Sequence, residues 1–161
     1  MKKLLILAAV ITASVATNAA SFKWSAANIF DPTDSTAKLA SGSGTATLYA
    51  YLSTADASTA IAVATTALTS DGVITKTFED TTNFTVGNDY TFFFKLEAKG
   101  YELTSGTVTK GATVATTENV NFGNFKTATT TGGAWAAVPE PTSGLLMLLG
   151  LAGLALKRKH A

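Results

Sequence analysis

The chain has 161 residues, a formal net charge of +1 and no cysteine, so neither a disulfide nor a thiolate metal site can form. Its single histidine, His160, lies in the tail, which leaves the body without a residue for a Ser-His-Asp triad or a histidine metal site. Between residues 20 and 138, ten acidic side chains face seven lysines, and the resulting charge of −3 argues against nucleic-acid binding.

The first twenty residues have the layout of a secretory signal peptide. Two lysines follow the initial methionine, an apolar stretch runs over residues 4–15, and mostly small residues occupy 17–20. We expect a signal helix over residues 1–19 that signal peptidase removes by cleaving after Ala19 or Ala20. The chain is therefore predicted to be exported.

The body, residues 20–126, has a composition that favours β-structure. Threonine, whose branched Cβ suits a pleated surface, accounts for 25 of the 119 residues between 20 and 138. Residues 45–52 and 91–99 alternate between apolar and polar side chains, which is typical of half-buried strands. In the second run we expect Phe92, Phe94, Leu96 and Ala98 on the core face and Lys95, Glu97 and Lys99 on the solvent face.

Turn sequences separate these runs at a spacing typical of an antiparallel sandwich. Asp71-Gly72, between residues 61–68 and 73–78, predicts a hairpin. Residues 57–68 are ambiguous, because their alanines favour a helix whereas Ile61 and Val63 favour a strand. We predict an all-β fold, a single Ig-like antiparallel β-sandwich of about seven strands, flanked by the N-terminal signal helix and a C-terminal apolar helix. The strands are expected near residues 21–26, 44–52, 60–68, 73–79, 90–98, 101–109 and 113–125.

Residues 127–137 are rich in Thr and Gly and lack strong patterning, which predicts a flexible spacer. Trp135, within this segment, can still fold back onto the domain.

The tail, residues 138–161, combines three features. Pro139, Glu140 and Pro141 form an extended segment that cannot continue into a helix. An uncharged apolar run follows over residues 144–156; it reaches roughly 20 Å as a helix, short of the roughly 30 Å of a bilayer core. The cationic end suits the headgroups of the cytoplasmic side, so the tail is compatible with a transient or a permanent hold on the inner membrane. The expected membrane helix includes Gly144, Leu145, Leu146, Leu148, Leu149, Leu151, Leu154 and Leu156, and its basic stop is Lys157, Arg158 and Lys159.

This order of Pro-Glu-Pro, apolar helix and basic end closely resembles the PEP-CTERM sorting tail of exported proteins from Gram-negative bacteria. The same tail is also labelled an ice-binding protein C-terminal domain. The resemblance implies that an integral-membrane transpeptidase, the exosortase, recognises Pro139, Glu140 and Pro141 and cleaves near them. With the signal peptide, it predicts a protein held at the inner membrane by its tail and then delivered to the cell surface or beyond.

Candidate ligand sites in the body each have a structural explanation as well. Tyr49 and Tyr51, with Phe93 on a neighbouring strand, can form a platform for a sugar ring or can simply pack on the sheet. Carboxylate pairs suit acid-base catalysis on glycans or, in loops, Ca²⁺ binding, but they also suit solvated turns and match no calcium motif. The pairs are Glu97 with Glu102, Asp31 with Asp34, and Glu79 with Asp80.

Thr-x-Thr pairs can form the hydroxyl arrays of ice-binding surfaces, but here they follow no common period. We predict a structural or adhesive protein of the cell surface or extracellular matrix, without cofactor, metal or enzymatic activity. The alternatives are a carbohydrate-binding module or a small glycan-active enzyme, with extracellular polysaccharide as the partner. The Thr-x-Thr pairs are Thr45/Thr47, Thr75/Thr77, Thr107/Thr109 and Thr127/Thr129.

Overall fold

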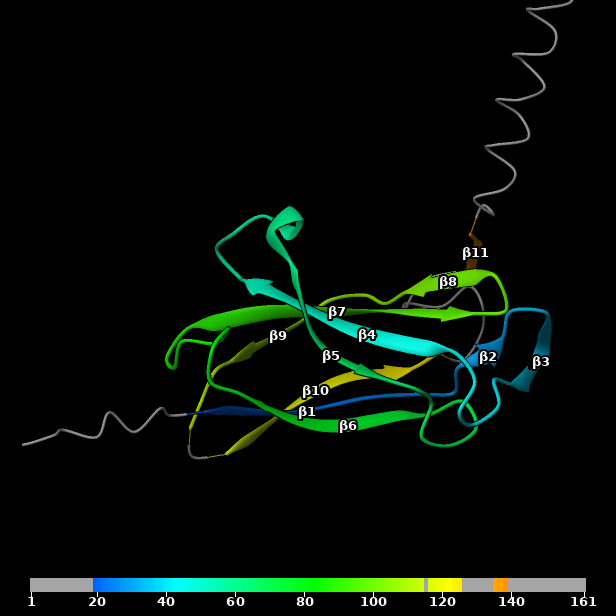
Figure 1. Ribbon diagram of the computed structural model, residues 1–161, viewed down its shortest axis with the longest axis horizontal. Helices are drawn as coiled ribbons and strands as arrows, with labels where there is room; N and C mark the ends of the chain where they lie inside the picture. Colours follow the sequence, from blue (N-terminus) through cyan, green and yellow to red (C-terminus); the bar gives the residue numbers. More distant parts are fainter. Residues whose placement is uncertain (1–18, 115, 126–134, 139–161) are drawn as a thin grey trace, which may run out of the picture.

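The computed structural model describes residues 19–114, 116–125 and 135–138, and its regular structure is almost entirely β-strand (Figure 1). The expected all-β class is therefore confirmed. The elements are β1 (Ala20–Ala27), β2 (Phe30–Asp31), β3 (Asp34–Lys38), β4 (Thr45–Leu52), the 3₁₀-helix η1 (Ala57–Thr59), β5 (Ile61–Thr66), β6 (Ile74–Asp80), β7 (Asp89–Ala98), β8 (Tyr101–Thr104), β9 (Val108–Gly111), β10 (Thr117–Asn124) and β11 (Trp135–Ala137).

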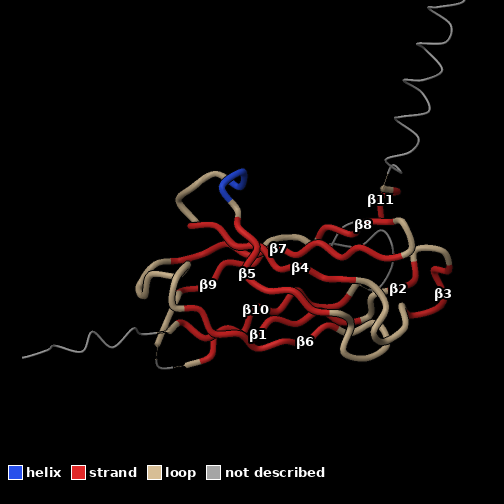
Figure 2. Tube along the Cα trace, in the orientation of Figure 1, coloured by secondary structure: helices blue, strands red, loops and turns tan. Residues whose placement is uncertain are grey.

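Two sheets face one another, and Figure 2 shows them as an upper and a lower layer. The upper, six-stranded sheet has the order β11-β8-β7-β4-β5, and β9 also pairs with β7. The lower sheet has the order β10-β1-β6, and β2 and β3 form a separate hairpin. The strands β4, β5, β7, β8 and β9 thus all lie in the upper layer.

The arrangement corrects two details of the predicted sandwich. β1 and β10 run parallel, which the chain allows since Ser21 and its partner Thr117 are 96 residues apart and no hairpin between them imposes an antiparallel direction. The order also differs from the Ig order, in which the first two strands of the domain are neighbours. Here the β2–β3 hairpin lies between β1 and β4 in the chain, and the chain changes sheet there, so β1 and β4 lie in opposite sheets.

The core lies between the two sheets and is rich in aromatic rings. Phe22 and Trp24 on β1 are fully buried, as are Phe92 and Phe94 on β7. The ring centroids of Phe22 and Phe92 are 5.1 Å apart, and those of Trp24 and Phe94 are 5.7 Å apart. Each such side chain contributes about 1.5–3 kcal/mol by burial. The period-two prediction for β4 and β7 is confirmed, since alternate residues of both strands face this core.

The predicted strand over residues 101–109 is divided into β8 and β9. At the break, the hydroxyl oxygen of Ser105 accepts from the Phe94 amide at 2.8 Å, while the Ser105 amide donates to the Phe94 carbonyl at 2.9 Å. A side chain thus replaces one backbone acceptor of the ladder, and the strand pairing stops there. The strand expected over residues 113–125 begins only at Thr117.

The turn at Asp71-Gly72 exists, but the predicted hairpin is wrong. β5 belongs to the six-stranded sheet and β6 to the three-stranded sheet, and only an isolated bridge joins Ser70 and Val73. Gly72 has a φ of +67°, and a Cβ at this position would lie 2.8 Å from the Ile29 carbonyl oxygen. The Gly72 amide donates to the Leu39 carbonyl oxygen at 2.7 Å, and the Ile29 amide donates to the Gly72 carbonyl oxygen at 3.0 Å. The turn is thus bonded to other segments of the chain, and the strands on its two sides enter different sheets.

Three short strands, β2, β3 and β11, were not predicted. The sequence Asp31-Pro32-Thr33-Asp34 joins β2 and β3. Trp135–Ala137, within the predicted spacer, forms β11 against β8, and the Trp135 indole donates to the Phe30 carbonyl oxygen at 3.1 Å.

The signal helix and the apolar helix over residues 144–156 lie outside the described residues. In the part that is described, no helix is long and apolar enough to cross a membrane.

Candidate functional site

The solvent face of the six-stranded sheet carries the aromatic residues that the sequence placed there. Tyr49 and Tyr51 alternate with the buried residues of β4, and Phe93 lies opposite Tyr49 on β7. The rings of Tyr49 and Phe93 stack with centroids 5.1 Å apart and planes 9° apart. Because these two faces cover one another, a sugar has only the outer face of each ring to pack on.

Hydroxyl groups form a row beside the aromatic pair and bond to one another. Thr91 lies in the middle, with its Oγ1 atom 2.9 Å from Ser53 Oγ and 3.1 Å from Thr109 Oγ1. Two of the Thr-x-Thr pairs do not share a surface, because Thr45 and Thr47 lie in the six-stranded sheet and Thr75 and Thr77 in the other. These two pairs therefore do not contribute to one flat hydroxyl array.

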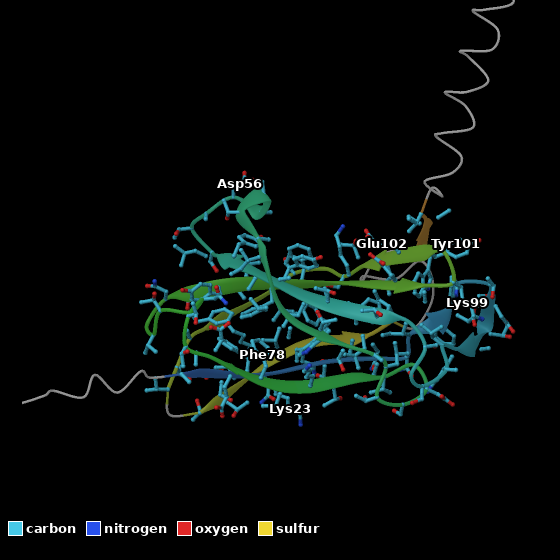
Figure 3. All side chains as sticks on the ribbon, viewed as in Figure 1. Lys23, Asp56, Phe78, Lys99, Tyr101 and Glu102 are labelled. Atoms are coloured by element: carbon cyan, nitrogen blue, oxygen red, sulfur yellow. The ribbon has the colours of Figure 1, made fainter. Side chains whose placement is uncertain are left out.

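Glu97 and Glu102 are direct neighbours across β7 and β8, on the two sides of the turn predicted between them. Figure 3 shows Glu102 projecting from β8 away from the sandwich. The Lys95 ammonium lies 3.0 Å from Glu102 Oε1, and the Thr104 hydroxyl donates to the same oxygen at 3.3 Å. Lys95 thus offsets the repulsion of two carboxylates placed side by side.

The loop carboxylates cap turns. Asp31 Oδ1 accepts from the amide of Thr33 at 2.8 Å and from its hydroxyl at 2.6 Å, and Asp34 receives the same two bonds from Thr36. A hydrogen bond from Lys99, followed by those from Thr33, lowers the pKa of Asp31 to about 2. The bonds from Thr36 lower the pKa of Asp34 as well. Within the described ranges, no group of three or more potential ligands gathers into a cation site.

Asp80 has the same capping role at the end of β6. Its carboxylate accepts from the amides of Thr82 and Asn83 at 2.7 and 2.8 Å and from the Asn83 side chain at 2.7 Å. Glu79 lies on the exposed side of the same strand. The two acidic neighbours therefore point to different environments, as expected from the alternation of side chains along a strand.

An open pocket of about 350 Å³ lies where β4 ends and β5 begins. Leu52, Ile61 and Tyr90 form its apolar side, and Asn83 and Asn88 contribute polar groups. Leu52 is 36% exposed and Ile61 is 44% exposed, so two large aliphatic side chains face solvent at one end of the sandwich. No sequence pattern indicates this pocket, since its walls come from separate segments of the chain.

Of the residues predicted for sorting and processing, the structure describes the signal cleavage site. Ala20 is the first residue of β1, is fully buried, and lies opposite Asp80 of β6. Ala19 precedes the strand. Pro139, Glu140, Pro141, the residues of the apolar run and the basic stop lie outside the described residues.

The last residue described is Val138, directly before this segment. Its amide donates to the Gly100 carbonyl oxygen at 2.9 Å, which ties the start of the tail to the turn between β7 and β8.

Comparison with known families confirms the resemblance of the tail. Residues 137–159 match the family model of the PEP-CTERM protein-sorting motif, in agreement with the span 138–161 expected from the sequence. The motif implies an exported protein that is sorted to the cell surface with an exosortase as its processing partner. Comparisons with curated proteins and with solved structures gave no match.

Proposed function

Since the chain carries a PEP-CTERM protein-sorting motif, we propose that it is a non-enzymatic surface or extracellular-matrix protein whose β-sandwich has a structural or adhesive role. The observation that carries the proposal is the position of the motif, residues 137–159, which begins at the last residue of the strand β11. Signal peptidase acts first, the tail then holds the chain at the inner membrane, and an exosortase-type transpeptidase releases the body.

The contacts of Val138 and Trp135 support a cleavage close to the folded body. Both residues are bonded to the body, through Gly100 and Phe30, and Pro139 follows at once in the sequence. A transpeptidase acting at residues 139–141 would therefore work close to the folded domain and leave only a short extension on the released protein.

The structural role is supported by the way polar and aromatic surface groups bond within the domain. Tyr49 stacks on Phe93, and Lys95 pairs with Glu102. The carboxylates of Asp31, Asp34 and Asp80 cap their own turns. Side chains used in this way stabilise loops and sheet faces, which suits a domain that serves as a durable surface component.

The decisive measurement is the intact mass of the protein recovered from membrane and extracellular fractions of its native host. We expect an extracellular form that lacks the first 19 or 20 residues and the apolar tail. The variant P139A/P141A should keep Lys157–Lys159 and stay with the membrane, whereas the control Thr131→Ala in the predicted spacer should be processed normally. Full-length tails on the wild-type protein in every fraction would refute sorting by an exosortase.

Carbohydrate binding is the second candidate, favoured by the three aromatic residues on one solvent face. Tyr51 lies opposite Thr91 and does not belong to the stacked pair, so its ring is the best placed for a sugar. If the alternative holds, Tyr51→Ala should abolish the retention of the protein on extracellular polysaccharide with no change in the urea midpoint. Equal retention of variant and wild type would leave the structural role as the function of the body.

A further inference from the structure

The six-stranded sheet ends in a strand that is open to another chain. β5 pairs with β4 on one side and has no partner strand on the other among the described residues. Figure 1 shows β5 descending from η1 across the near side of the molecule towards β6 of the lower layer. The free backbone N–H and C=O groups of such an edge can pair with any extended segment.

β5 also lacks the charges that usually protect an edge. No charged residue occurs between residues 57 and 70, which include the whole strand. The other edge strands of the two described sheets carry charges or are very short. β6 carries Lys76, Glu79 and Asp80, β9 carries Lys110 and β10 carries Glu118, whereas β11 is only three residues long. The β-branched residues Ile61, Val63, Thr65 and Thr66 give β5 a high strand propensity instead.

Two features limit the open stretch of β5. The register with β4 shifts at Val63, which is a bulge, and the Lys76 ammonium donates to the Thr65 carbonyl oxygen at 2.6 Å. The beginning of the strand has no such protection. There Ile61 is 44% exposed, next to Leu52 and the open pocket, so an apolar surface adjoins the free backbone.

We propose that β5 is the self-association edge of this protein, and that it pairs antiparallel with β5 of a second copy about a two-fold axis. An identical strand is a suitable partner because an uncharged edge brings no like charges together. A two-fold contact closes into a dimer and joins the two six-stranded sheets into one. The inference deepens the proposed structural role and rests on it, since it explains how the body links surface components.

With the strands centred on one another, Ala62 lies opposite Thr65 of the second copy. Both residues face the solvent side of the sheet, because their partners in β4 are Tyr49 and Thr47. Substitutions at these two positions therefore change the charge of the edge without entering the core.

The test uses residues 20–138, because the described core lies wholly between Ala20 and Phe125. Sedimentation equilibrium measures association of the wild type, of A62K/T65K and of A62D/T65D. We expect a wild-type dimer, at least a tenfold weaker dimer for each variant, and recovery of association in an equimolar mixture of the two. The control Thr45→Lys adds a charge to the same sheet face on β4, away from the edge, and should associate as the wild type does.

Hydrogen exchange then locates the contact, since amides of residues 61–66 should gain protection as the wild-type concentration rises. A wild type that stays monomeric up to its solubility limit overturns the proposal. So does a dimer that both double variants retain, or a failure of the mixture to recover association while each variant remains folded by circular dichroism. The processing test on the native host is independent of these results, so a failed edge and a failed sorting proposal can be told apart.

Discussion

The ion pair between Asp31 and Lys99 links two parts of the domain that are 68 residues apart. Asp31 ends β2, and Lys99 occupies the turn between β7 and β8 with a φ of 51°. The pair therefore holds the β2–β3 hairpin against the six-stranded sheet. Replacing Asp31 by Asn keeps the size of the side chain and its acceptor for Thr33, but removes the charge that meets Lys99.

The pKa of Asp31 sets the expected loss of stability. Its fall from 3.8 to about 2, caused first by the bond from Lys99, corresponds to about 2.4 kcal/mol as an upper limit. Lys99 is half exposed, so solvent screening reduces the expected contribution to about 1 kcal/mol. Because the folded pKa is depressed, this stability is present above the unfolded pKa and is lost as the pH falls from about 5 towards 2.

Urea unfolding of residues 20–138 at pH 7 and at pH 2 measures the effect. Asp31→Asn should lower the free energy of unfolding by about 1 kcal/mol at pH 7 and by much less at pH 2. Asp34→Asn is the matched control, since the partners of Asp34 are Thr36 and no cation. Lys99→Met should cost nothing more when Asp31 is already Asn. An Asp31→Asn loss that is equal at both pH values, or absent at pH 7, would refute the assignment.

Gly72→Ala should lower the free energy of unfolding in urea by more than about 2 kcal/mol, because the added Cβ would collide with the Ile29 carbonyl oxygen. Gly87→Ala is the control and should cost only about 1 kcal/mol, because open space surrounds Gly87. Phe22→Ala should lower the free energy of unfolding by about 3–5 kcal/mol and Tyr49→Ala by about 1 kcal/mol, since only the ring of Phe22 is fully buried. Similar losses for the two variants would contradict the placement of the core. Mass spectrometry of the exported protein should find Ala20 as its first residue, because cleavage after it would remove a buried residue of β1.

Much of the fold could be predicted because alternation along a strand is a local property. The inward positions of β4 and β7, including Phe92 and Phe94, follow from the period of two alone. The division between β8 and β9 could not be predicted, since it depends on a bond between Ser105 and Phe94 in another strand. The sheet to which β6 belongs was missed for a similar reason, because the Asp71-Gly72 turn looks the same whether or not its flanking strands pair.

The candidate sites divide in the same way. The sorting tail is read from a contiguous run of residues, so its Pro-Glu-Pro segment, apolar run and basic end were recognisable without any fold. The roles of Tyr49, Glu102 and Asp31 depend on Phe93, Lys95 and Lys99, and the distances between these partners are set by strand register and turns.

The sequence by itself determined the sorting motif, the all-β class and the inward face of the main strands, because each depends on neighbouring residues only. The tertiary structure decided that β1 and β10 pair in parallel, that β5 ends its sheet without a charge, and that a carboxylate in one hairpin meets a cation in a distant turn. These outcomes depend on which strands hydrogen-bond to one another, and backbone hydrogen-bonding groups are nearly the same in every residue. The pairing of strands is therefore determined by the packing of the complete domain.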